Sequence, residues 1–137
     1  MAGVDGVLET SLYVDNLERA SGFYTGLFGF KVLVSDARME ALSVSAKQVL
    51  LLFLKGASTS VSRTPVGALP PHDGQGNLHL AFAISTESHG GWERTLNEKG
   101  IKIESRVEWP RGGRSLYFRD PDGHLLELVT PGCWAIY

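Results

Sequence analysis

The sequence predicts an α+β protein in which two tandem β-α-β-β-β units form a single domain over residues 1–137. Strand-like runs of alternating apolar side chains are interrupted, once in each half of the chain, by a segment with helical spacing. The order of elements before residue 56 recurs after residue 77. Corresponding positions keep a similar offset, since Glu9 and His79 lie about 70 residues apart, and Leu51 and Glu127 about 76. We expect unit one over 5–56, a linker over 57–76, unit two over 77–132 and a tail over 133–137.

The first unit is predicted to open with a strand over residues 7–14, because apolar side chains there alternate with polar ones. A helix follows. Asp15 is its expected N-cap, Glu18 completes a capping box three residues later, and Gly29 is placed to end it. Three further strand-like runs are joined by short polar turns, over residues 30–35, 39–45 and 48–54.

The second unit repeats this order after a stretch of a different kind. Residues 55–77 contain three prolines and four glycines and lose all periodicity, which is typical of a linker or of a loop over a site. A strand is then expected over 78–84, followed by a helix that Ser85 or Thr86 would cap and Gly100 would end. Three more strands complete the unit, over residues 101–107, 113–119 and 124–129.

The last two of these strands are joined by Asp120-Pro121-Asp122-Gly123, a sequence typical of a tight turn. Glu127 lies in the second of them, where the residues on both faces of the strand are apolar. This predicts a strand that is covered on both sides and a carboxylate that is not simply in water. Such a charge needs a cation, an arginine partner or a proton.

Charge and cysteine content limit the partners and the compartment. Thirteen basic and fifteen acidic residues give a net charge of −2 without any basic stripe, so we expect neither nucleic acid nor a membrane as partner. The single cysteine, Cys133, cannot form an internal disulfide, and the first residues lack the features of a signal peptide. These observations predict a cytoplasmic protein.

The sequence FYTGLFGF in the first helix and the ending YFRDPDGHLLEL resemble the vicinal oxygen chelate superfamily. That group contains glyoxalase I, extradiol dioxygenases, fosfomycin-resistance thiol transferases and bleomycin-resistance proteins. The resemblance implies a glyoxalase-like fold, in which the curved mixed sheets of the two units form a cup around a divalent metal. Its metal-binding positions, on the first and last strands of the units, hold Glu9, His79, Leu51 and Glu127 here.

Because leucine cannot bind a metal, the resemblance implies three ligands, Glu9, His79 and Glu127, with open positions for water or substrate. Such a mixture of nitrogen and oxygen ligands suits Fe, Mn, Ni, Co or Zn. Each ligand has a simpler alternative. Glu127 could pair with Arg119 or Arg114, His79 could bond a backbone carbonyl, and Glu9 could face solvent.

Further residues are candidates for contact with a small-molecule substrate. Tyr117 is the candidate for proton transfer, although cross-strand packing would also explain it. The expected substrate-binding residues are Arg119, Arg114, Trp109, Phe53 and Leu51. His72 is a weak acid–base candidate in the linker, and we expect His89 and His124 to be surface residues.

Two functions remain open from the sequence. The first is a metal-dependent lyase, isomerase, thiol transferase or dioxygenase whose substrate chelates the metal through neighbouring oxygens. The second is a metal-free binding protein of the bleomycin-resistance type. A former enzyme that lost its site is a third interpretation.

The apolar tail after Gly132 is expected to be buried, either against the core of its own chain or against a second subunit, and we expect a homodimer.

Overall fold

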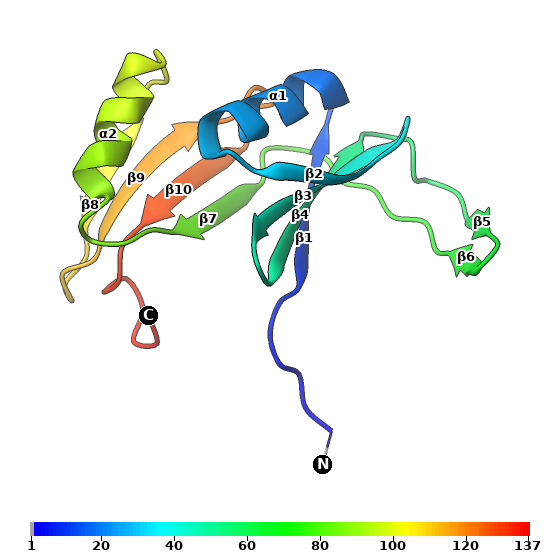
Figure 1. The fold of residues 1–137 in the computed structure, drawn as a ribbon, viewed down its shortest axis with the longest axis horizontal. Coiled ribbons are helices and arrows are strands. Elements are labelled where there is room, and N and C mark those ends of the chain that lie inside the picture. The colour runs from blue at the N-terminus through cyan, green and yellow to red at the C-terminus, as the bar shows by residue number, and fades with distance from the viewer. Residues whose placement is uncertain (1) are drawn as a thin grey trace. The chain divides into compact units, whose positions relative to one another are not determined.

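The computed structural model describes residues 2–137 and divides into two compact units, Met1–Gly76 and Asn77–Tyr137 (Figure 1). Each unit contains one helix and a four-stranded mixed sheet, in the predicted order β-α-β-β-β. No helix within residues 2–137 has the length and apolarity needed to cross a bilayer. The sequence therefore predicted the class and the repeat correctly.

In the first unit the sheet has the order β1-β4-β3-β2, with β1 parallel to β4 and the other neighbours antiparallel. One face is buried together with Ala20, Tyr24 and Leu27 of the helix, because apolar side chains alternate along β1 and β4. The elements are β1 (Glu9–Val14), α1 (Leu17–Phe28), β2 (Lys31–Ser35), β3 (Met39–Ser45) and β4 (Gln48–Leu54).

Helix α1 begins one residue later than the sequence suggested. Asn16 is the N-cap, and its side-chain oxygen accepts a hydrogen bond from the amide of Arg19 at 2.9 Å. The predicted capping box of Asp15 and Glu18 is therefore wrong, and the Asp15 carboxylate instead lies 3.4 Å from the Lys55 ammonium. Gly29 ends the helix in a left-handed conformation, with φ of 72°, as predicted.

The stretch expected to be a linker or a loop folds back on its own unit. It contains a short hairpin of β5 (Ser62–Thr64) and β6 (Gly67–Leu69). Its two ends are tied together, since the Asp73 carboxylate accepts a hydrogen bond from the Gly56 amide at 3.1 Å. Gly74 then lies directly on Tyr13 of β1, where an added Cβ would come within 2.3 Å of the ring. Residues 55–77 are thus a loop held against the first sheet.

The second unit repeats the arrangement, with the order β7-β10-β9-β8 and β7 parallel to β10. Its elements are β7 (His79–Ala83), α2 (His89–Glu98), β8 (Ser105–Glu108), β9 (Arg114–Arg119) and β10 (Leu125–Val129). One face of this sheet carries fully buried side chains, and Leu96 of α2 is buried as well. The fully buried residues of that face are Leu116, Phe118, Leu126 and Leu128.

The start of α2 differs from the prediction. Ser88 is the N-cap, and it makes no capping hydrogen bond with its side chain. Ser85 and Thr86 form the preceding turn instead, where the Ser85 hydroxyl oxygen accepts a hydrogen bond from the Ser88 amide at 3.2 Å. Helix propensity at this end is weak because two glycines occupy the first turn, so the turn decides where the helix begins.

The turn between β9 and β10 is present as predicted, and Asp120 organises it. One carboxylate oxygen accepts hydrogen bonds from the amides of Asp122 at 3.0 Å and His124 at 2.9 Å. The turn carries His124 into the core, where the ring Nδ1 accepts a hydrogen bond from the Leu78 amide at 2.9 Å. The expectation of surface histidines is wrong, since His124 is 0% exposed and His89 is 4% exposed.

The buried His89 leads to a prediction about pH. Burial is the main reason that its pKa lies below the usual value of 6.5; the positive charge of Arg114 and a smaller effect of Arg106 act in the same direction, against Glu93. His89 therefore binds a proton more readily in the unfolded chain than in the folded one. Its contribution to the free energy of unfolding is fully present above about pH 6.5, the pKa in the unfolded chain, and is lost as the pH falls through the lower pKa of the folded protein. Thermal unfolding at about pH 7.5 and 5.5 should show a smaller loss for His89→Gln than for the parent. Equal losses in Tm would contradict this.

Candidate metal centre

His79 and Glu127 meet on one face of the second sheet. β7 and β10 are parallel neighbours in which His79 pairs with Leu125, so Glu127 lies two residues further along on the same face. The His79 Nε2 is 3.2 Å from the Glu127 Oε1. Ala81 and Ala83 follow His79 on the exposed side of β7, and their small side chains leave space beside the imidazole.

The hydrogen bonds of this pair define which atoms are available. The His79 Nδ1 lies 2.9 Å from the Leu125 carbonyl oxygen, which can only accept, so Nδ1 carries a proton. In a neutral imidazole, Nε2 then presents its lone pair to the Glu127 carboxylate. Two acceptors at this distance repel each other unless a cation or a proton lies between them.

Ser115 and Trp109 hold the carboxylate in place. Glu127 is only 6% exposed, and its Oε2 accepts a hydrogen bond from the Ser115 hydroxyl at 2.5 Å. The same hydroxyl accepts a hydrogen bond from the indole Nε1 of Trp109 at 2.8 Å. The chain of contacts leaves Oε1 directed toward His79. Ser115 was missed by sequence reasoning, although its place on the face of Tyr117 and Arg119 was readable from the strand alternation.

Tyr117 completes this face of the sheet. It is the direct cross-strand partner of Glu127, and its ring stacks on that of His79 with centroids 6.2 Å apart. Burial, and then the charge of Glu127, raise the pKa of its phenol. Tyr117 is therefore a protonated hydrogen-bond donor beside the pair.

The two arginines expected near the substrate are placed differently. Arg119 shares the face of Tyr117, but its guanidinium pairs with Glu104 at 2.8 Å and donates to the Gly123 carbonyl at 3.1 Å. Arg114 lies on the opposite face of β9, because its position in the strand differs by an odd number from that of Tyr117. Neither arginine pairs with Glu127 in the structure.

The first unit has the same geometry with different side chains. Glu9 pairs with Val49, and Leu51 lies two residues beyond Val49 in β4. The positions of Glu9 and Leu51 in the first unit therefore correspond to those of His79 and Glu127 in the second. Glu9 is exposed and Leu51 offers no ligand atom, so this unit supplies one candidate ligand. Within residues 2–137, no three His, Cys, Asp or Glu side chains are grouped closely enough to hold a metal ion.

The donor set of His79 and Glu127 fits a divalent transition metal. A neutral imidazole nitrogen and a carboxylate oxygen are both ligands that these metals take, and a cation would replace the repulsion at 3.2 Å by attraction. The contact of Nδ1 with a backbone carbonyl is the usual support of a metal-binding histidine. Ser115 plays the equivalent part for the carboxylate.

The fold and this donor pair are those of a glyoxalase-like α+β protein whose second unit supplies two candidate metal ligands, His79 and Glu127. Residues 6–128 match the family model described as the Glyoxalase/Bleomycin resistance protein/Dioxygenase superfamily. The chain belongs to this superfamily.

The chain is also similar to individual members of this superfamily. The chain is 30% identical to the metallothiol transferase FosB of Shouchella clausii (strain KSM-K16), over 93% of its own length and 81% of the relative. The crystal structure of a lactoylglutathione lyase from Agrobacterium tumefaciens matches with a TM-score of 0.88 and 27% identity, over 98% of this chain and 99% of that one. The fosfomycin resistance protein FosX from Mesorhizobium loti, with 23% identity and a TM-score of 0.63, covers 93% of each chain and supports the fold.

These similarities confirm the predicted fold class and the first of the two predicted functions. They support the prediction of a divalent-metal-dependent enzyme of the glyoxalase type, a group that includes thiol transferases. The His79–Glu127 pair is consistent with the predicted divalent metal ion.

Proposed function

We propose that the enzyme acts on a thiol, or on the adduct of a thiol, together with a small electrophile that presents neighbouring oxygens to the metal. The observation that carries the proposal is the 3.2 Å approach of the His79 Nε2 to the Glu127 carboxylate, with Nδ1 held by the Leu125 carbonyl, an arrangement that suits a shared cation. The substrate class is supported by the names of two relatives, a metallothiol transferase and a lactoylglutathione lyase.

His79 and Glu127 are the proposed ligands of the second unit. Glu9 is the proposed third ligand on the family pattern, although the three side chains are not grouped within residues 2–137. Glu9 occupies in β1 the register position that His79 occupies in β7. When bound, the metal would polarise the substrate oxygens and supply several kcal/mol of transition-state stabilisation. Three protein ligands leave positions open for those oxygens.

The other residues of this face act on the ligands and on the substrate. Ser115, held by Trp109, keeps the Glu127 carboxylate in one orientation. Tyr117, protonated beside the pair, donates a hydrogen bond to the substrate oxygen on which negative charge develops. In a transfer reaction the sulfur–carbon bond forms, a carbon–oxygen bond breaks, and the thiol proton ends on the released oxygen.

The assembly and compartment belong to the same proposal. Trp134 is 70% exposed and Ile136 is 96% exposed in the single chain, so the C-terminal tail has apolar surface for a second subunit to cover. We propose a homodimer in the cytoplasm, where the single Cys133 stays reduced.

Turnover should require metal and thiol together. We expect protein loaded with Mn(II), Fe(II), Co(II), Ni(II) or Zn(II) to consume glutathione in the presence of an α-oxoaldehyde or a small epoxide, measured by loss of free thiol and by mass spectrometry of the product. Chelation should remove the activity, and readdition of metal should restore it. A folded protein that consumes no thiol with any of these metals would contradict the proposal and favour a binding protein of the bleomycin-resistance type.

A further inference from the structure

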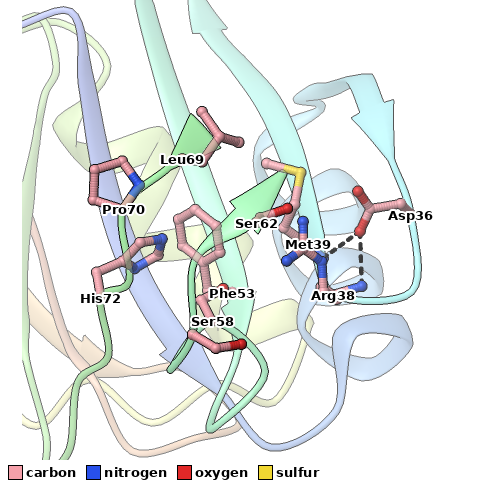
Figure 2. Close-up of a pocket in the computed structure, with 10 residues that line it drawn as sticks. Asp36, Arg38, Met39, Phe53, Ser58, Ser62, Leu69, Pro70 and His72 are labelled. Carbon is pink, nitrogen blue, oxygen red and sulfur yellow. Dashed lines mark hydrogen bonds between the residues drawn. The ribbon is translucent and has the colours of Figure 1, made fainter. Parts of the chain in front are cut away.

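The first unit contains a pocket of about 360 Å³ to which Glu9 does not contribute (Figure 2). Phe53 of β4 and Met39 of β3 line it from the sheet, and Leu69, Pro70 and His72 line it from the loop of residues 55–77. Its volume is at the lower end of the range for small-molecule sites, which suits a ligand of modest size.

Arg38 brings a positive charge to this pocket, and its guanidinium is not engaged in an ion pair with any residue that the structure describes. Its side chain is half-buried, and within residues 2–137 its guanidinium makes neither an ion pair nor a side-chain hydrogen bond. Asp36 also lines the pocket, but one of its oxygens accepts hydrogen bonds from the amides of Arg38 at 2.7 Å and Met39 at 3.0 Å. A half-buried guanidinium with its donors free favours an anionic ligand.

The wall beside Arg38 is aromatic and held in place. The rings of Phe53 and His72 meet edge to face with centroids 4.3 Å apart, and the Tyr13 hydroxyl lies 2.8 Å from the His72 Nδ1. The His72 amide donates a hydrogen bond to the Ser58 carbonyl at 2.9 Å, which ties the loop to itself. Leu69, which also lines the pocket, is 52% exposed and would gain from being covered by an apolar group.

We propose that this pocket binds an organic carboxylate with an aromatic or branched apolar body. Arg38 holds the carboxylate through its paired N–H donors, the hydroxyls of Ser58 and Ser62 are within the same lining, and the body packs between Phe53, His72 and Leu69. One guanidinium matches a single negative charge, and the nearby Asp36 disfavours a dianion such as a phosphate. We assign this acid as part of the enzyme's substrate, and that assignment rests on the proposed function, whereas binding of the acid itself needs no metal.

Calorimetric titration of chelator-treated protein with 4-phenylbutyrate tests the inference, with neutral 4-phenylbutyramide as the paired probe. The carboxylate should bind at least roughly tenfold more tightly than the amide, because a charged hydrogen-bonded pair adds more than about 1.4 kcal/mol. Arg38→Met should remove this difference. Arg63→Met is the matched control, since Arg63 is an exposed arginine of the same unit that does not line the pocket, and it should bind as the parent does.

Each outcome decides. Equal binding of acid and amide by the parent, no binding of 4-phenylbutyrate, or parent-like binding by Arg38→Met would overturn the inference. If Arg38→Met unfolds, the comparison of acid and amide in the parent still decides. Glu127→Gln should keep full binding of 4-phenylbutyrate, so a failure of the metal-dependent activity alone would contradict the proposed function and leave the pocket assignment standing.

Discussion

Glu127→Gln is expected to abolish stoichiometric metal binding while the fold persists. The amide keeps the shape of the side chain but replaces a carboxylate oxygen that is 3.2 Å from His79 Nε2 by a neutral group. Loss of a residue that only supports a ligand costs about 10–100-fold in affinity, so loss of a ligand should cost at least about 100-fold. Protein purified without chelator and incubated with Mn, Fe, Co, Ni or Zn should contain close to one metal per proposed site, measured by elemental mass spectrometry. His79→Ala should behave in the same way.

Glu104→Gln is the matched control for this experiment. Glu104 is an exposed carboxylate of the same unit that pairs with Arg119 at 2.8 Å, so its loss changes the charge equally without touching the pair. Its metal content should equal that of the parent. Ser115→Ala should fall between the two, because it removes the hydrogen bond to the Glu127 Oε2 but no ligand. Retention of metal by Glu127→Gln at the parent's affinity would exclude His79 and Glu127 as the centre.

Gly132→Ala should strongly destabilise the protein, although Gly132 is not part of the apolar core. Gly132 has φ of 107°, and an added Cβ would lie 2.5 Å from the Gly113 nitrogen and 2.8 Å from the Arg111 carbonyl oxygen. Both neighbours are backbone atoms of the turn between β8 and β9, which cannot move without moving Trp109. We expect a loss of roughly 2–4 kcal/mol, since a clash with backbone adds to the strain of a left-handed alanine. Thermal unfolding should show a fall in Tm of about 10 °C.

Gly112→Ala separates the two causes. Gly112 lies in the same turn with φ of 93°, but nothing lies within 4 Å of an added Cβ, so only the backbone strain applies. Its Tm should fall clearly less than that of Gly132→Ala. A Gly132→Ala protein as stable as Gly112→Ala would show that the close approach of the two backbones has no energetic weight. The same experiment should report on the site, because displacement of Trp109 removes the hydrogen bond that positions Ser115.

Local patterns determined most of the fold from the sequence. The alternation of apolar side chains along residues 39–45 and 48–54 predicted the exact bounds of β3 and β4. The turn residues after Arg119 predicted the hairpin of β9 and β10. Strand ends and caps were less accurate, since Asn16 and Asp15 are both good N-cap residues and only the path of the chain selects one. The repeat and the alternation also placed Glu127 correctly as a buried carboxylate, and the family resemblance proposed His79 as its neighbour.

The tertiary structure alone decided the partners of these side chains. The contact of His79 Nδ1 with the Leu125 carbonyl depends on the register of two strands about 46 residues apart, and so does the distance to Glu127. The pocket at Arg38 depends on the return of residues 55–77 over Tyr13, which no periodicity encodes because a loop is held by single contacts. Periodicity reports which face a residue takes within its own element. The atom it meets across the fold is set by register and loop path, and these come from the whole chain.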